Sequence, residues 1–176
     1  MRYLILVVLT VISAQAGAQT VVSRMETAAK PSFMAMPNVR VFSEILGECA
    51  ADGAVSLRIV YCTSSNQILV AADQLAFPEI GYLLGHTFGH AVQVQHGVAD
   101  IELRTIRERP EEEVVLRGYV DRQVDCIAGF LVAKASYDRG SLADWIANNP
   151  FDNIYWGLHP LNLGPVMPVS LVESNI

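Results

Sequence analysis

The sequence predicts a single α+β domain with a mainly helical core and a small antiparallel β-hairpin. Two long stretches carry apolar residues at helical spacing, one from Pro78 to His96 and one from Pro110 to Ala135. Ahead of them, two short β-rich segments flank a polar turn. The 176 residues are enough for one compact domain and too few for two comfortable ones.

The N-terminus has the pattern of a secretory signal peptide, which we place at residues 1–18. Arg2 precedes the apolar run Tyr3 to Ile12, and two overlapping small-x-small cleavage sites follow, ending at Ala16 and Ala18. The run is well short of the roughly 20 apolar residues that a membrane span needs. We therefore expect cleavage, no stable membrane span, and a periplasmic or secreted protein. An uncleaved N-terminal anchor is the alternative.

The exported chain is acidic. The whole sequence has 12 basic and 18 acidic residues, and loss of Arg2 with the signal leaves 11 − 18 = −7. An acidic surface without a Lys/Arg patch argues against nucleic acid and anionic lipid as partners.

Three cysteines remain after cleavage, and export permits a disulfide between two of them. Cys49 and Cys62 flank a short segment with the turn-prone pair Asp52-Gly53, so we predict a bridge between them. Cys126 lies on an apolar helical stretch and is expected to be a buried thiol. The alternative is that all three are free.

The chain before the hairpin has the weakest signals. Residues 19–38 contain Pro31 and Pro37 and no clean period, and we expect a loose N-terminal arm there. The domain itself is then expected over residues 39–176. Residues 39–46 fit a helix or a strand equally well.

The hairpin and the two helices have clear boundaries. Residues 55–61 and 67–72 are β-rich and flank the turn at 63–66. Pro78 suits the first turn of a helix, and Gly97 suits its end. Pro110, followed by three glutamates, is a strong start for the second helix, and Gly140 suits its end.

The remaining segments are less regular. Residues 98–109 are charged, and we expect an irregular connection or a short helix. Ser141-Leu142-Ala143-Asp144 resembles a capping box that opens a short helix to Ile146, and an ordered coil or short strand follows. Four aromatic residues are expected mainly in the core: Phe88, Tyr119, Phe130 and Trp145.

Two pairs of residues carry the chemistry. His86 and His90 are four apart on the first predicted helix, so both imidazoles leave one face and can bind one metal ion. Gly89 between them would let another backbone approach. Asp121 and Asp125 have the same spacing on the second helix. Catalytic zinc takes three protein ligands, so Asp121 could be the third ligand to Zn²⁺ and Asp125 could orient a ligand histidine.

Readings without a metal stand beside this one. The two histidines could be buried imidazoles bonded to Asp121 and Asp125. Asp121 could also belong to a surface ladder with Glu113 and Arg117, each four residues apart.

The two helix segments together resemble a known family. YLLGHTFGHAVQ at 82–93 and DRQVDCIAG at 121–129 are similar to the H-E-x-G-H-x-V-Q and E-L-Q-A-D-C-x-A-G motifs of the neutral zinc metallopeptidases. The resemblance spans roughly Val55 to Val132. It implies a zincin-like fold, zinc ligands at His86, His90 and Asp121, and Asp125 in support of a ligand.

The departures from that pattern bear on activity. Thr87 stands where the family has its general base, and a hydroxyl cannot take a proton from water near neutral pH. Asp121 is one methylene shorter than the family's glutamate. We therefore expect an exported, zinc-metallopeptidase-like protein that is inactive or strongly impaired and that binds a polypeptide or serves as a structural module.

Two alternatives remain open. One is an active zinc peptidase with a base from the acidic stretch that contains Glu102, Glu108 and residues 111–113. The other is a metal-free structural or binding domain.

Overall fold

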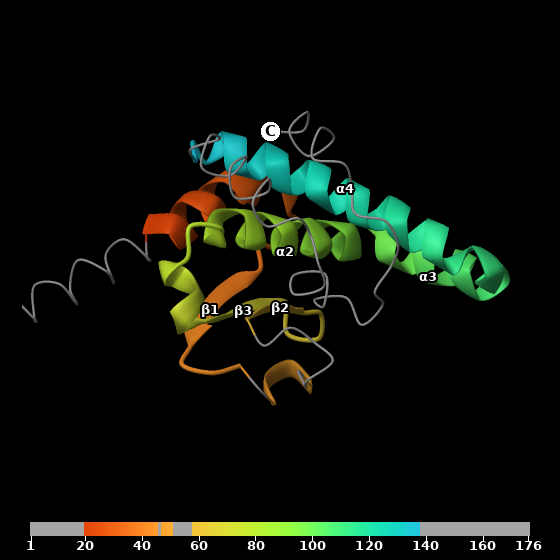
Figure 1. Ribbon diagram of the computed structural model, residues 1–176, viewed down its shortest axis with the longest axis horizontal. Coiled ribbons are helices and arrows are strands. Elements are labelled where there is room, and N and C mark those ends of the chain that lie inside the picture. The colour runs from red at the N-terminus through yellow and green to blue at the C-terminus, as the bar shows by residue number, and fades with distance from the viewer. Residues whose placement is uncertain (1–19, 46, 51–57, 138–176) are drawn as a thin grey trace, which may run out of the picture.

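The computed structural model describes residues 20–45, 47–50 and 58–137, and this part of the chain is mainly helical with one small sheet (Figure 1). The longer helices are an N-terminal helix over 20–29, α2 (Ile80–Gln95), α3 (Val98–Glu108) and α4 (Glu113–Lys134). The strands are β1 (Asn38–Phe42), β2 (Ile59–Cys62) and β3 (Gln67–Ala71). Short helical turns lie at η1 (Lys30–Ser32), η2 (Glu48–Ala50), η3 (Ala72–Ala76) and η4 (Pro110–Glu112).

Several predictions fall on residues outside these ranges. They are the signal peptide at 1–18, the first residues of the predicted strand, 55–57, the helix from Ser141 to Ile146 with Trp145, and the coil or short strand after it. In the described part of the chain, no helix is both long enough and apolar enough to cross a membrane.

The sheet has three strands in the order β1-β3-β2. β2 and β3 pair antiparallel, with Tyr61 opposite Ile68, which confirms the predicted hairpin. β1 pairs parallel with β3, with Val39 opposite the same Ile68. The segment at 39–46, which the sequence left undecided, therefore begins as a strand, and the sheet is mixed.

The helices stack on the sheet in layers. α2 lies between the sheet and α4, and α3 runs beside the N-terminal end of α4 (Figure 1). The core forms where these layers meet and includes Ile68, Leu84, Phe88 and Leu131, all fully buried. α2 and α4 correspond to the two predicted helices, but α4 ends at Lys134 and not at the predicted stop, Gly140.

Of the two expectations for residues 98–109, an irregular connection or a short helix, the structure has the helix, α3. Residues 98–108 form a continuous helix that starts directly after Gly97, whose φ of +73° lets the chain turn sharply out of α2. The helix is amphipathic. Ile106 is buried on its inner face, while most of its charged residues are exposed.

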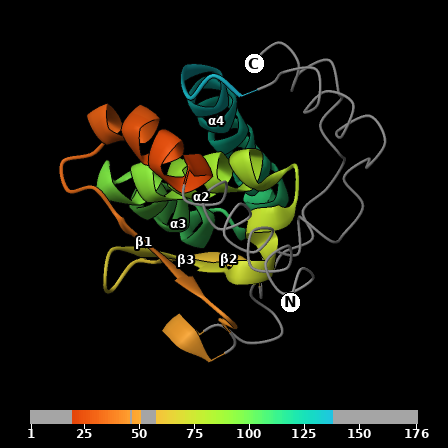
Figure 2. The ribbon, with the colours of Figure 1, turned by 90° about the vertical axis from the view of Figure 1, so that its left-hand side faces the viewer.

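The expectation of a loose arm before the hairpin is wrong for residues 20–29. These residues form a helix (Figure 2). Met25, Ala28 and Ala29 on it are buried in the main core. The Arg24 Nε donates to the Ala135 carbonyl at 2.9 Å, so the helix also caps the end of α4.

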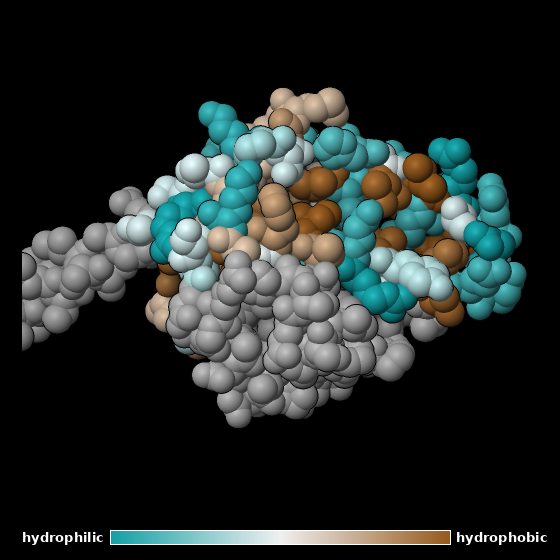
Figure 3. Space-filling view, turned by 90° about the horizontal axis from the view of Figure 1, so that it is seen from above, coloured by the Kyte–Doolittle hydropathy of each residue, from teal (hydrophilic) through white to brown (hydrophobic). Residues whose placement is uncertain are grey.

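The disulfide Cys49–Cys62 is present, as predicted, and joins the η2 turn to β2. The expectation for Cys126 is wrong, because its thiol is exposed on α4. Tyr119 and Phe130 are likewise exposed on this helix, at 60% and 56%, whereas Phe88 is in the core as expected. α4 carries apolar residues on both sides, so its sequence does not reveal which side faces inward. Figure 3 shows the resulting mixture of apolar and hydrophilic side chains on the upper face.

Candidate metal centre

Two glycines on α2 allow α4 to approach closely. A Cβ added to Gly89 would lie 3.0 Å from Val124 Cγ1 and 3.1 Å from the Val124 carbonyl oxygen. A Cβ on Gly85 would lie 3.2 Å from the Ala128 carbonyl oxygen. The expected role of Gly89 is confirmed, and this contact brings the histidines of α2 to the aspartates of α4.

His86 is anchored to Asp125 inside this interface. Both side chains are buried, and His86 Nδ1 lies 3.1 Å from Asp125 Oδ1. The same oxygen accepts the hydroxyl of Tyr82 at 2.7 Å, and burial together with the Asp125 charge raises the pKa of Tyr82. An ionised carboxylate can only accept hydrogen bonds, so Nδ1 of His86 carries the hydrogen. The lone pair is then on Nε2, the nitrogen through which such an imidazole binds a metal.

Asp125 has one further unused acceptor. Its Oδ2 is buried and has no hydrogen-bond partner among the described residues. An unpaired buried carboxylate oxygen is costly and normally has a protein or water partner.

The two imidazoles converge on each other. His86 Nε2 and His90 Nε2 lie 3.2 Å apart, and the rings meet edge to face at 75°. Two imidazole nitrogens on one tetrahedral zinc, each about 2.05 Å from the ion, would be about 3.3 Å apart. The pair therefore fits a shared metal ion. The same distance also fits a hydrogen bond from His90 to the lone pair of His86.

Asp121 lies near this pair. Burial raises the pKa of Asp121 to about 6; the His86 imidazole, Arg117 and Arg122 act to lower it, and Asp125 raises it further. Arg117 pairs with Glu113 at 2.9 Å, so the first step of the predicted surface ladder is present. Among the residues that the structure describes, no three His, Cys, Asp or Glu side chains already form a group that could hold a metal.

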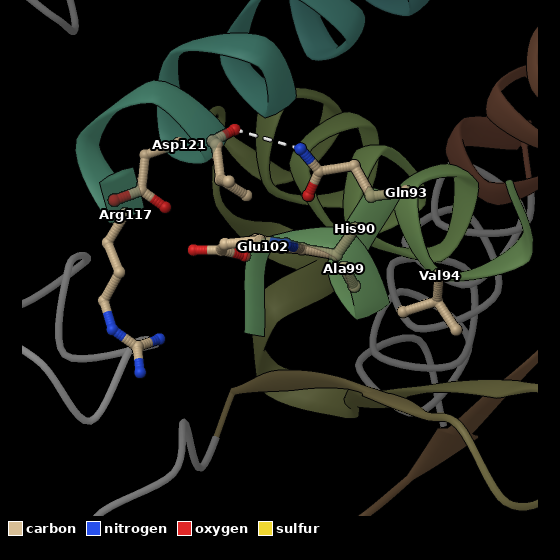
Figure 4. Close-up of a pocket in the computed structure, with 8 residues that line it drawn as sticks. His90, Gln93, Val94, Ala99, Glu102, Arg117 and Asp121 are labelled. Atoms are coloured by element: carbon tan, nitrogen blue, oxygen red, sulfur yellow. Dashed lines mark hydrogen bonds between the residues drawn. The ribbon is translucent and has the colours of Figure 1, made fainter. Parts of the chain in front are cut away.

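A pocket of about 120 Å³ opens beside His90 (Figure 4). It is smaller than the 300 Å³ or more typical of sites for drug-sized ligands. Its lining comes from α2, α3 and α4 and consists of His90, Gln93, Val94, Ala99, Glu102, Arg117, Val120 and Asp121. Gln93 Nε2 donates to the Val120 carbonyl at 3.1 Å and joins two of the walls.

Glu102 lines the pocket, but the sequence alone did not distinguish it from the other acidic residues nearby. It is half-buried, whereas Glu108 on the same helix is exposed. The signal was present in the spacing, because Glu102 is four residues before the buried Ile106 and so lies on the same helical face.

Thr87 does not face the pocket. Its side chain is buried, and Oγ1 donates to the Leu83 carbonyl at 2.8 Å on its own helix. The hydroxyl is therefore committed to the backbone. It supplies no proton acceptor to the histidines.

The ligand types near the pocket are imidazole nitrogens and carboxylate oxygens. Both suit zinc, and imidazole also suits copper, iron and nickel. The free thiol of Cys126 is exposed and does not line the pocket. No family model, curated protein or solved structure matches this chain.

Proposed function

We propose that this protein is an exported, zincin-like zinc-binding protein in which peptide hydrolysis is absent or strongly impaired. The observation that carries the proposal is the His86–His90 pair. The two Nε2 atoms are 3.2 Å apart, and Asp125 accepts from Nδ1 of His86. This is the arrangement in which a carboxylate orients a ligand imidazole toward a metal.

Three residues would bind the zinc ion, and a fourth would orient one of them. His86 and His90 would bind the ion through Nε2, and Asp121 would add an oxygen ligand. Asp125 keeps the hydrogen on Nδ1 of His86 and so keeps Nε2 available. When bound, zinc supplies Lewis acidity and polarises a carbonyl or a water molecule.

Hydrolysis of a peptide also needs proton transfer. A base must take a proton from the attacking water, and an acid must give one to the leaving amine. The Thr87 hydroxyl donates to the Leu83 carbonyl and can do neither near neutral pH. Because general acid–base catalysis contributes about 10² to 10⁴ in rate, we expect a loss of that order.

Two further observations support export. The N-terminal sequence has the pattern of a signal peptide, and the Cys49–Cys62 disulfide suits an oxidising compartment. We propose the periplasm or the outside of the cell as the location. We propose a polypeptide as the partner, bound without efficient cleavage.

A metal-free structural domain is the second candidate. It is favoured by the N–H···N hydrogen bond that would also explain the 3.2 Å distance between His90 and His86. In that case His86, Asp125 and Tyr82 form a buried polar network that serves stability alone.

The test is a Thr87→Glu variant, with Thr87→Gln as the matched control. Both replace the hydroxyl by a longer side chain, but only glutamate can accept a proton near pH 7. We expect Thr87→Glu to cleave casein faster than wild type, with a rate that a chelator abolishes, and Thr87→Gln to gain nothing. The proposal of an impaired enzyme is wrong if wild type already cleaves casein in a chelator-sensitive way and Thr87→Glu is no faster.

A further inference from the structure

The outer side of α4, away from α2, carries a row of exposed apolar side chains. Val115, Tyr119 and Phe130 are exposed at 55%, 60% and 56%, and the thiol of Cys126 is exposed between the last two. Steps of four, seven and four residues place all four on one side of the helix. Figure 3 looks down on this side of the molecule and shows apolar side chains among the hydrophilic ones. We call these four residues the α4 stripe.

The core of this chain does not use the stripe. The inner side of α4 packs against α2 and buries Val124, Ala128 and Leu131 completely. A single exposed apolar residue is ordinary on a protein surface, but several that are contiguous mark an interaction site. The stripe is therefore a candidate for contact with a partner.

Charges of opposite sign stand at the two ends of the stripe. Lys134 is exposed at the C-terminal end of α4, and its Nζ lies 5.6 Å from the centre of the Phe130 ring. Glu111 is exposed at the N-terminal end, in the η4 turn that precedes the helix. It belongs to neither of the ion pairs that the two following glutamates make. A surface with an acid at one end and a base at the other is complementary to a copy of itself in the opposite direction.

An antiparallel second copy would match the stripe along its whole length. With Glu111 opposite Lys134 of the other copy, Val115 lies opposite Phe130 and Tyr119 lies opposite Cys126, because equal steps run in opposite directions along the two helices. Two-fold symmetry makes each of these contacts twice. A parallel pair would instead place like charges together at both ends, which is unfavourable.

Arg122 stands near the middle of the stripe, where the same residue of the second copy would approach it. Its guanidinium lies 4.7 Å from the centre of the Tyr119 ring, and its charge acts to lower the pKa of Asp121. The side chain therefore turns toward the N-terminal end of α4 and away from the middle. Two copies can meet there without placing their guanidinium groups face to face.

We propose that the α4 stripe is the interface of a symmetric homodimer, in which the α4 helices of two copies pack antiparallel with Glu111 of each opposite Lys134 of the other. This inference goes beyond the proposed function. It does not depend on zinc, because the stripe lies on the opposite side of α4 from His86 and His90 of α2.

The first measurement is the mass of the full mature chain by sedimentation equilibrium, in a reductant that keeps Cys126 as a thiol. We expect a dimer. Phe130→Glu buries an unpaired charge in the interface and should weaken the dimer at least about tenfold. Phe77→Glu is the matched control, because Phe77 is an exposed aromatic residue before α2, and it should stay within about twofold of wild type. A monomeric wild type, or equal weakening by both variants, overturns the proposal.

The second measurement exchanges the charges at the two ends. Glu111→Lys and Lys134→Glu each place like charges opposite one another, and each should weaken the dimer about two- to tenfold. The double variant reverses both ends and should return the dissociation constant to within about twofold of wild type. A double variant that is weaker than either single variant overturns the antiparallel arrangement.

The third measurement tests the register with Tyr119→Cys. Positions 119 and 126 of one chain are about 10 Å apart along α4, too far for a disulfide within the chain. In the dimer the new thiol lies opposite Cys126 of the other copy. Glutathione disulfide should oxidise these two thiols to an intermolecular disulfide and be reduced to two molecules of glutathione.

Tyr119→Cys combined with Cys126→Ser is the control for this cross-link. The two copies of position 119 are about 10 Å apart along the helices, so the control should not cross-link. Equal cross-linking of both variants, or of neither, overturns the register.

Residues 138–176 of the same chain are the other candidate to cover the stripe. In that case wild type is a monomer, and Cys126 reacts slowly with a thiol reagent. A monomer whose Cys126 reacts rapidly would show that the stripe is free. Either result overturns the homodimer.

Discussion

Gly89→Ala tests the contact that brings the two helices of the site together. The added Cβ would lie 3.0 Å from Val124 Cγ1 and 3.1 Å from the Val124 carbonyl oxygen, so α2 and α4 must move apart by a few tenths of an ångström. Such overpacking costs about 1–3 kcal/mol. Alanine also favours a helix over glycine by about 1 kcal/mol, which partly offsets that cost.

Gly118→Ala on α4 removes this second effect from the comparison. The nearest atom to its Cβ is Arg122 Nη1 at 3.6 Å, at the end of a flexible side chain, so only the gain in helix propensity remains. Urea denaturation of both variants should place Gly89→Ala about 1–3 kcal/mol below Gly118→Ala in free energy of unfolding. Equal stabilisation by both substitutions would refute the close packing at Gly89.

Two further predictions concern the aspartates. Asp125→Asn removes the buried carboxylate that accepts a hydrogen bond from His86. We expect the free energy of unfolding, measured by urea denaturation, to fall by about 1.5–3 kcal/mol, and the zinc affinity, measured by dye competition, to fall about 10–100-fold. Unchanged values would contradict the anchoring role of Asp125. In chelator, Asp121 binds its proton more tightly in the folded chain, with a pKa of about 6, than in the unfolded chain, so its contribution to stability is lost as the pH rises from about 4 to about 6. Denaturation between pH 4 and pH 7 should show a smaller decline for Asp121→Asn, and an identical decline in both proteins would show that Asp121 is not the group responsible.

Local signals explain what the sequence could predict of the fold. α2 and α4 have helical spacing and clear ends, and the β2–β3 hairpin needs only the turn between its strands. The pairing of β1 with β3 joins residues 38–42 to 67–71, and such a distant parallel contact leaves no local pattern.

The N-terminal helix was missed for a different reason. Val21, Met25 and Ala28 have helical spacing, but the prolines at 31 and 37 suggested a loose segment. Its stability comes from burial in the core and from its contact with the end of α4, which no local pattern could show.

The candidate site also has a part that the sequence predicts and a part that depends on tertiary packing. The spacing of His86 and His90 predicts that they share a helix face, and the second pair of aspartates has the same period. Glu102 lines the pocket because of the direction in which α3 runs. That direction is set by the left-handed turn at Gly97, directly after α2 ends. Which side of α4 faces inward depends on packing, so the exposure of Cys126 could not be read from its apolar neighbours.

The zinc content of the tag-free protein tests the central claim most directly. Wild type and His90→Ala are equilibrated with added zinc, passed through gel filtration and analysed for metal. We expect one zinc per wild-type chain and a large loss in the variant, because the proposed site binds the ion through both His86 and His90. Wild type without stoichiometric zinc, or a variant that retains zinc as fully as wild type, would contradict it.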